Sequence, residues 1–463
     1  MIDLARMEQY RENNRIEAKK ALGGLPHSIW ETYSAFANTL GGLLLLGVEE
    51  HADKSLHTVD LPDPERLVRE FWALVNDPKK ASVNILSEDD VRVEEAGGDH
   101  IVVISVPRAA RFDRPVYVDG DPLHGSYRRS GEGDYRCSAE EVEAMQRDAA
   151  LLTQDMRLLE KLEPDVLSAE SLDRYRDRLR ALRPGHVWET LPDAVFLEKL
   201  GAAAPGRDGR LHPTAAGLLM FGRTAEIRRV YPRFSLRYRS GGNAEGETGE
   251  NVHDFFFHTE ARLAASLPDA PAPVRKAVGE ALGNCLINAD YYGRYGVEVT
   301  RRRDAIVLTN PGDFRIGLDA ARAGGRSDPR NGYLMKMFNL LDVGESAGGG
   351  IPGIFRVWQE QGWGEPALVQ TVGPGAVTLT LPLGPQRAHI GRKTGDRAAI
   401  RKAARREQAI QYLTDHASAG AEELSAVLGI RPSGAERILR ALAAEGIAAA
   451  EGRGAEKIYR LKA

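Results

Sequence analysis

Three polar side chains recur at helical spacing inside an otherwise apolar stretch near the middle of the chain. Glu280, Asn284 and Asn288 are four residues apart, so they share one face of a predicted helix from Val274 to Ala289. An acid and two amides on an apolar helix need polar partners, because a buried polar group without a hydrogen bond is costly. This face is therefore a candidate binding site.

Glycine-rich sequence follows that helix at two places. Asn310-Pro-Gly312 stands at the end of a predicted strand, Ala305 to Thr309, and Gly344 to Gly353 leads into a predicted apolar helix, Ile354 to Gln359. A glycine-rich loop that feeds a helix N-terminus offers backbone N–H groups and the positive end of the helix dipole to phosphate. The second stretch therefore predicts a phosphate-binding loop.

The order Glu-x-x-x-Asn, strand-Asn-Pro-Gly, glycine-rich loop and helix resembles the GHKL ATPase fold. More closely, it is similar to the divergent GHKL-like domain that follows a Schlafen-type domain in bacterial predicted transcriptional regulators. The resemblance implies ATP and Mg²⁺ as cofactors, with Asn284 as the metal ligand and Glu280 as the base of an ATPase. It implies that Asn310 and Gly312 lie near the adenine. The implied cofactor-binding set is Asn284, Asn288, Asn310, Gly312, Gly348, Gly350 and Gly353.

Two departures from the family pattern leave an alternative open. GHKL enzymes usually have Asp where Asn310 stands, and family members commonly read His-Arg-Asp-Tyr where this chain has Asn288-Ala-Asp-Tyr. The alternative is a degenerate fold that serves dimerisation or acts as a rigid connector.

A second set of motifs lies in the first third of the chain. Arg15-Ile-Glu17-Ala-Lys19, Ala35-Phe-Ala-Asn38-Thr-Leu-Gly41-Gly42, Gly47-Val48-Glu-Glu50 and Tyr127-Arg128-Arg129-Ser-Gly131 resemble the Schlafen Alba-like signature over most of residues 8 to 145. The resemblance implies DNA or RNA binding, with Lys19, Arg128 and Arg129 as nucleic-acid contacts. Asn38, Gly41 and Gly42 have a structural explanation, because the glycines end a helix by allowing positive φ.

Some Schlafen relatives are metal-dependent RNA nucleases, and this gives an enzymatic alternative. Glu12, Glu17 and either Glu49 or Glu50 would supply three carboxylates that hold a divalent cation, which activates water for attack on a phosphodiester. The bland explanation of Glu12 is a solvated acid in a polar helical segment, and Lys19 is expected to pair with Glu17.

The C-terminal end has the layout of a winged helix-turn-helix. Helices are predicted at Glu407 to His416, Ala421 to Leu428 and Gly434 to Glu445, followed by two short strands around Glu451-Gly-Arg-Gly-Ala-Glu. In this layout a recognition helix enters the major groove of DNA. The predicted DNA contacts are Arg437 and Arg440 on that helix and Arg453 and Lys457 on the wing. The alternative is a winged helix used for protein contacts or dimerisation.

Composition and charge narrow the class of protein. A chain of 463 residues suggests about three domains. Two cysteines cannot form a disulfide framework or a zinc cluster, no apolar run reaches about 18 residues, and the N-terminus lacks an export signal. We therefore expect a cytoplasmic protein without a membrane partner. Residues 385–463 hold 15 Lys and Arg against 9 Asp and Glu, whereas the whole chain has a net charge of -4.

The element pattern predicts an α+β multidomain protein. The expected parts are a Schlafen Alba-like α/β domain at residues 1–145, a helical connecting region at 146–240, a GHKL-like α/β sandwich at 241–384 and the winged helix at 396–463. Residues 6–23 are predicted to start the chain as a polar helix, followed by a helix at 28–40 and a strand at 43–48. Strands are also predicted at 115–118 and 126–129, and a hairpin at 369–383.

The functional hypothesis is an ATP- or ligand-responsive DNA-binding transcriptional regulator that acts as a homo-oligomer, because winged-helix regulators usually bind as symmetric dimers. Occupancy of the middle domain by a nucleotide or another small effector would shift the orientation of the DNA-reading end. The sequence favours a regulator over an enzyme. The alternatives are a Schlafen-type endoribonuclease acting on structured RNA, a weak ATPase, and a non-catalytic interaction scaffold.

Overall fold

The computed structural model describes residues 10, 12–240, 250–344, 350–371 and 375–384, and in the C-terminal part residues 405, 406, 409, 410, 412, 413, 416, 418–428, 430–444, 447–452 and 458–461. The chain divides into two compact units, residues 1–386 and residues 387–463. Within the described ranges, no helix combines the length and apolar character needed to cross a bilayer. The predicted α+β multidomain class is confirmed.

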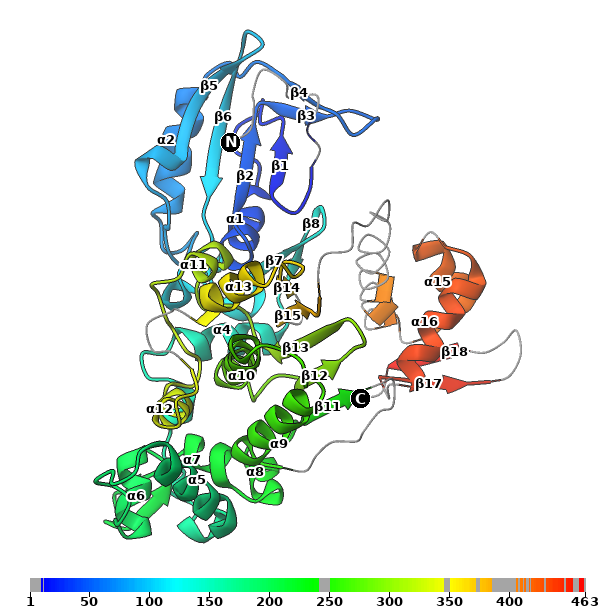
Figure 1. The fold of residues 1–463 in the computed structure, drawn as a ribbon. Helices are drawn as coiled ribbons and strands as arrows, with labels where there is room; N and C mark the ends of the chain where they lie inside the picture. Colours follow the sequence, from blue (N-terminus) through cyan, green and yellow to red (C-terminus); the bar gives the residue numbers. More distant parts are fainter. Residues whose placement is uncertain are drawn as a thin grey trace. The chain divides into compact units, whose positions relative to one another are not determined.

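The N-terminal module, residues 10–149, is built on a mixed sheet with the strand order β1-β2-β6-β5 (Figure 1). Strand β1 runs parallel to β2, and the other pairs are antiparallel. The sheet strands are β1 (Ile16–Lys19), β2 (Gly42–Leu46), β5 (Val91–Ala96) and β6 (Asp99–Val106). The module also contains β3 (Val48–Glu50), β4 (Leu56–Thr58), β7 (Tyr127–Ser130), β8 (Gly133–Arg136), α1 (Ile29–Asn38), α2 (Pro64–Val75), α3 (Pro122–Gly125) and α4 (Ala139–Ala149).

A single residue, Asn38 at the end of α1, connects this helix to two neighbouring chain segments. Its Nδ2 donates to the carbonyls of Val116 at 2.8 Å and Tyr127 at 3.0 Å, and its Oδ1 accepts from the Val116 N–H at 2.7 Å. Gly41 follows with φ +73°, and a Cβ there would lie 2.8 Å from the Val106 carbonyl oxygen. The Asn and Gly residues of this motif thus have the structural role expected from the sequence.

Two expectations for this module were wrong. Residues 16–19 form strand β1 instead of part of a polar helix, because their backbone pairs with the buried strand β2. The polar side chains of this segment suggested a solvent-exposed helix. In the structure, however, Glu17 is buried and pairs with Arg129 inside the module. Residues 115–118 make only isolated bridges, at Tyr117 and Val118, instead of a strand.

The central module, residues 236–384, contains a mixed sheet with the order β11-β12-β13-β15-β14. Strand β11 is parallel to β12, and the remaining pairs are antiparallel, including the predicted hairpin of β14 and β15. The strands are β11 (Leu236–Ser240), β12 (Val297–Arg301), β13 (Ala305–Pro311), β14 (Ala367–Thr371) and β15 (Ala376–Pro382). The helices are α9 (Val252–Ala265), α10 (Ala272–Ile287), α11 (Leu318–Ala323), α12 (Gly332–Leu340) and α13 (Gly350–Glu360).

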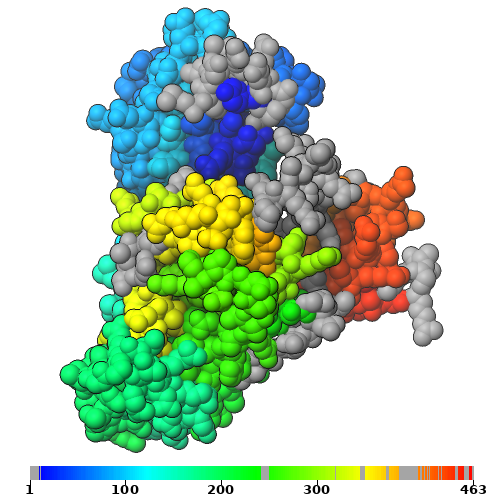
Figure 2. Space-filling view, in the orientation of Figure 1, coloured from blue at the N-terminus to red at the C-terminus, as the bar shows by residue number. Residues whose placement is uncertain are grey.

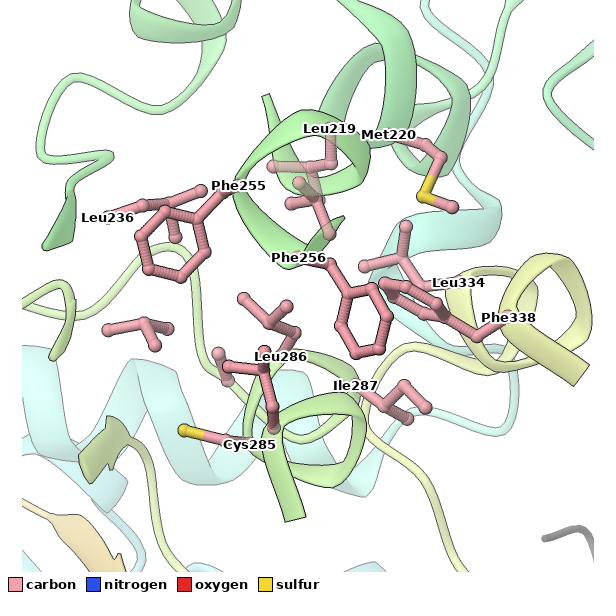
Figure 3. Close-up of a cluster of buried hydrophobic side chains, with 14 of the residues drawn as sticks. Leu219, Met220, Leu236, Phe255, Phe256, Cys285, Leu286, Ile287, Leu334 and Phe338 are labelled. Atoms are coloured by element: carbon pink, nitrogen blue, oxygen red, sulfur yellow. The ribbon is translucent and has the colours of Figure 1, made fainter. Parts of the chain in front are cut away.

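The connecting region, residues 150–235, contains four α-helices and shares one hydrophobic core with the central module. Leu219 and Met220 lie in the same cluster of buried side chains as Phe256 and Phe338 (Figure 3). The rings of these two phenylalanines are 5.1 Å apart. The elements of the region are α5 (Ala169–Leu182), α6 (Asp193–Leu200), β9 (Ala203–Pro205), β10 (Leu211–Pro213), α7 (Ala215–Phe221) and α8 (Thr224–Val230).

The second unit contains the elements of a winged helix. Its sheet has the order β16-β18-β17, and buried Leu424, Leu439 and Tyr459 lie in its core. The described elements are β16 (Ala419–Gly420), α15 (Ala421–Leu428), α16 (Pro432–Ala444), β17 (Ala448–Glu451) and β18 (Ile458–Leu461). The second and third predicted helices and both wing strands begin and end within a few residues of their predicted positions, and the first predicted helix, residues 407–416, lies partly outside the described residues.

Helix α7 provides a test of packing against propensity. Thr214 caps the helix by accepting from the Gly217 N–H at 3.0 Å, and a Cβ on Gly217 would lie 1.8 Å from the Ala202 carbonyl oxygen. Alanine normally stabilises a helix by about 1 kcal/mol relative to glycine. We expect Gly217→Ala to lower the stability of the first unit by about 3 kcal/mol, because the overpacked backbone must move.

The measurement is denaturant unfolding followed by tryptophan fluorescence. The comparison variant is Thr214→Ser, which keeps the hydroxyl that caps the helix and that donates to the Gly201 carbonyl at 2.6 Å, and which should cost about 1 kcal/mol through the lost methyl group. A Gly217→Ala protein as stable as wild type would contradict this account of the packing.

Candidate functional site

A pocket with a cavity volume of about 120 Å³, open to solvent, lies in the central module among α10, β13, α13 and the segment between β13 and α12. Asn284 and Asn288 of α10 and Asn310 of β13 line it, as does Gly350 at the start of α13. Residues separated by many positions in the sequence are thus brought together around one cavity. The apolar part of the wall comes from Leu308, Ile354, Leu368, Val377 and Leu379.

Helix α10 presents the amides because its other face is buried. Val278, Leu282 and Leu286 lie in the hydrophobic core, which leaves Asn284 and Asn288 on the pocket side. The Asn288 Nδ2 donates to the Asn284 carbonyl at 2.9 Å at the end of the helix. The predicted shared face of the helix is confirmed in its geometry, while the roles of its residues stay a prediction.

Glu280 lies one turn before Asn284 on the same helix and has polar contacts at the pocket edge. Its Oε1 accepts from the Asn284 Nδ2 at 3.3 Å, and its Oε2 accepts from the Gly344 N–H at 3.0 Å. Gly350 approaches this pair closely, because a Cβ on Gly350 would lie 2.7 Å from both the Asn284 Nδ2 and the Glu280 Oε1. A side chain at this first position of α13 would therefore displace the ends of the Asn284 and Glu280 side chains.

The glycine-rich stretch is helical earlier than expected. Helix α13 begins at Gly350, so Gly350 and Gly353 belong to the helix and not to the preceding loop. Gly353 has an open environment, with only the end of the Arg356 side chain near a Cβ, at 4.0 Å. Gly348 lies outside the described residues. A side chain would therefore meet close neighbours at Gly350 but open space at Gly353.

The strand end on the opposite side of the pocket carries the other predicted residues. Asn310 is buried, and its Nδ2 lies 3.4 Å from the Asn288 carbonyl, so β13 and α10 meet directly. Gly312 has φ +98° and donates to the Gly375 carbonyl at 2.8 Å. The guanidinium of Arg330 fills the space where a Cβ of Gly312 would lie.

Charged residues of the pocket were missed by the sequence analysis. Arg315, Arg326, Asp313 and Arg330 all line the cavity from the segment between β13 and α12. Burial raises the pKa of the Asp313 carboxyl even though arginines surround it, and burial lowers the pKa of Arg315. Apart from the six residues of helix α11, this segment has no regular structure, and only its mixture of acidic and basic residues distinguishes it in the sequence.

The N-terminal carboxylates lie near one another but are engaged by cations. Burial raises the pKa of Glu12, and repulsion from Glu17 and Glu50 adds to the shift, while the Ala18 N–H that Glu12 accepts at 3.0 Å opposes it. Glu17 binds Lys19 at 2.6 Å through Oε1 and Arg129 at 2.7 Å through Oε2. Glu50 binds Lys54 at 2.8 Å, and Glu49 pairs with Lys20. Among the described residues, no group of three or more His, Cys, Asp or Glu is arranged to hold a metal ion.

The predicted nucleic-acid contacts of this module have partners within it. Arg129 is almost completely buried between Glu17 and Asp134, which it binds at 2.7 and 2.9 Å. Lys19 is held by Glu17, and Arg128 pairs with Glu141 at 3.0 Å. In this arrangement Arg129 connects β1 to the β7–β8 hairpin and has a structural role.

The recognition-helix candidates lie on α16 of the second unit. Arg437 is exposed, and Arg440 is exposed while pairing with Glu436 at 2.7 Å one turn earlier. The inward side of α16 carries Leu439 and Leu442, so the arginines lie away from the core. The wing candidates Arg453 and Lys457 are outside the described residues.

Comparisons with family models match three parts of the chain. Residues 12–138 match the family Schlafen, AlbA_2, residues 143–237 match a domain of unknown function, and residues 295–381 match the family described as putative ATP-dependent DNA helicase recG C-terminal. No curated protein matches the sequence.

One solved structure is similar to nearly the whole chain, and another is similar to part of it. The crystal structure of the DIP2311 protein from Corynebacterium diphtheriae is 17% identical, with 97% of this chain and 95% of that chain covered and a TM-score of 0.40. The N-terminal domain of a putative ATP-dependent DNA helicase RecG-related protein from Nitrosomonas europaea is 34% identical, with 29% of this chain and 90% of that chain covered and a TM-score of 0.23.

The Arg129 network predicts a strong dependence of the N-terminal module on one guanidinium. Arg129→Met should destabilise the module by about 3–5 kcal/mol, because two buried carboxylates lose their shared counter-charge. Arg136→Met is the matched control, since Arg136 is exposed on the neighbouring strand β8. The midpoint of thermal unfolding measures the effect. Equal midpoints for the two variants would show that the network is not required for folding.

Proposed function

Because the chain carries an N-terminal Schlafen AlbA_2 domain and a domain of the recG C-terminal type, we propose that it is a nucleotide-responsive DNA-binding regulator. One observation carries the proposal. The residues predicted to hold a nucleotide, Asn284, Asn288, Asn310 and Gly350, come from three separate elements and line one pocket. A concave, largely apolar pocket with a few convergent polar groups is the usual form of a small-molecule site.

The pocket lining suits the parts of a magnesium–adenine nucleotide complex. Leu308, Val377 and Leu379 offer an apolar surface to an aromatic base, and the Asn284 amide offers an oxygen ligand to Mg²⁺. Arg326, exposed in the pocket lining, adds positive charge that attracts a polyphosphate, whereas Arg315 and Arg330 are paired with Asp328 and Asp148. Bound Mg²⁺ would neutralise phosphate charge beside α10.

Glu280 is the proposed base of an ATPase, but its surroundings favour binding over turnover. Its carboxylate accepts hydrogen bonds from Asn284 and the Gly344 backbone, and it lies against the first residue of α13. These contacts give Glu280 a role in holding the pocket edge. Hydrolysis is therefore not needed for the proposed regulatory role.

The proposed output is the winged helix. Exposed Arg437 and Arg440 on α16 are placed to approach phosphates or base edges when the helix enters a major groove. We propose that a second copy of the chain binds the adjacent half-site, in the manner usual for such regulators. The excess of basic residues in residues 385–463 supports an electrostatic contribution to DNA binding.

The nuclease alternative has less support. A metal at Glu12, Glu17 and Glu50 would have to displace the Lys19 and Arg129 contacts of Glu17. We therefore retain the regulator as the main proposal, with RNA as a second possible ligand of the N-terminal module and a non-catalytic scaffold as the outcome if neither ligand binds.

Nucleotide binding is tested with two glycine variants of one helix. Gly350→Ala places a methyl group against Asn284 and Glu280, whereas Gly353→Ala meets open space. We expect Gly350→Ala and Asn284→Ala to weaken binding of Mg-ATP at least about tenfold, the usual cost of losing a hydrogen bond to a charged group. Gly353→Ala should bind like wild type. Titration calorimetry is the measurement, and wild-type affinity in Gly350→Ala would contradict the assigned site.

DNA binding is tested by a salt series on a fragment of the protein's own promoter. Arg437→Ala should weaken binding, and a lost phosphate contact should reduce the salt slope by about 1. The matched control is Arg207→Ala, which removes the same charge from the exposed β9–β10 turn of the first unit. Unchanged affinity in Arg437→Ala would remove α16 as the recognition helix.

A further inference from the structure

One wall of the pocket is also the contact surface for the N-terminal module. The pocket-wall segment, residues 312–331, joins β13 to α12 and supplies Phe314, Arg315 and Arg330 to the cavity. The N-terminal module holds this segment from the other side. Arg108 donates to the Phe314 carbonyl at 2.8 Å, and Arg111 binds Asp328 at 2.5 Å. Figure 2 shows the cyan and yellow-green parts of the chain in contact here.

Arg330 is the centre of these contacts. Its Nε and Nη2 bind the two carboxylate oxygens of Asp148 at 3.0 and 2.6 Å, a bidentate pair between the central module and the end of α4. The same guanidinium donates to the Asn288 carbonyl at 2.7 Å and to the Asp313 carbonyl at 2.9 Å. One side chain therefore contacts the end of α10, the pocket-wall segment and the N-terminal module.

The pair is buried, so its charges depend on each other. The side chains of Arg330 and Asp148 are 8% and 15% exposed. Burial by itself would raise the pKa of Asp148, but the Arg330 guanidinium holds that pKa below its usual value. The Nε of Arg114, a residue that is 4% exposed, has no hydrogen-bond partner in the described part of the chain, and Asp148 is one of two carboxylates whose charge favours the protonated form of Arg114. Asp148 is thus a needed counter-charge for the cluster.

We propose that Arg330 is a positioning residue that couples the nucleotide pocket to the N-terminal module through Asp148. The carbonyl that Arg330 holds belongs to Asn288, one turn after Asn284 on the helix that carries the proposed metal ligand. Any shift of the pocket-wall segment on ligand binding moves the partners of Arg108, Arg111 and Asp148. Occupancy of the pocket and docking of the N-terminal module are therefore linked, and by reciprocity each strengthens the other.

This inference rests on the proposed function for its ligand, and the test separates the two. Asp148→Asn removes the counter-charge from outside the nucleotide pocket, since Asp148 does not line that cavity. The matched control is Glu143→Gln on the same helix α4, where the side chain is 64% exposed. Both variants are made in the full chain and compared with wild type.

Two readouts are measured. Calorimetry should show Mg-ATP binding to Asp148→Asn weakened on the order of tenfold, within the range typical of coupled sites, while Glu143→Gln binds like wild type. Hydrogen–deuterium exchange should show Mg-ATP protecting both α10 and residues 108–150 in wild type, but only α10 in Asp148→Asn. If Asp148 had only a structural role, Asp148→Asn would lower the stability of the protein, but Mg-ATP would still protect both α10 and residues 108–150 from exchange.

The ligand-free state gives an independent criterion. Without nucleotide, exchange in residues 312–331 should be faster in Asp148→Asn than in wild type and Glu143→Gln. If wild type binds no Mg-ATP, the proposed ligand is wrong, and this ligand-free comparison alone decides the positioning role. If exchange in residues 312–331 is the same in all three proteins, or if Asp148→Asn binds Mg-ATP as wild type does, the coupling is refuted.

Discussion

The central module depends on helix α10, which has one face in the hydrophobic core and the other face in the pocket. Helix α10 buries Val278, Leu282 and Leu286 in a core shared with the connecting region, and this burial fixes its rotation. The helical repeat then fixes the directions of the remaining side chains of the helix. Asn284 and Asn288 therefore face the pocket. The site thus owes its geometry to apolar packing on the far side of the helix.

Polar groups that are buried for structural reasons organise the rest of the first unit. Asn38 joins α1 to two chain segments through its amide, and Arg129 joins β1 to the β7–β8 hairpin through Glu17 and Asp134. Buried polar groups of this kind are costly when unpaired, so each network specifies one arrangement of the backbone around it. Arg330 forms such a network between the central module and the N-terminal module. The proposed coupling of the pocket to the N-terminal module depends on this network.

The sequence predicted what depends on local periodicity and failed where distant residues decide. The amide face of α10 and the positions of α15 and α16 follow from spacing alone, and both appear in the structure. Strand β1 was missed because its pairing partner, β2, is far along the chain and its own side chains are polar. The Arg330–Asp148 pair joins positions 182 residues apart, and a local sequence pattern cannot predict such a contact. The start of α13 was also misjudged, because glycine has a low helix propensity and tertiary packing against Glu280 and Asn284 overrides it.

The shared core has a consequence for how the chain must acquire its structure during synthesis. The hydrophobic clusters of the N-terminal module and its Arg129 network lie within the first 134 positions, so that module can fold while synthesis of the later parts continues. The connecting region cannot do so, because the hydrophobic core that contains Phe221 and Tyr231 includes residues as late in the chain as Leu381. A nascent chain therefore carries apolar helices without a finished core for about 150 residues of elongation, which takes roughly 8 to 30 seconds at about 5 to 20 residues per second. This interval is when chaperone capture and misassociation compete most strongly with correct folding.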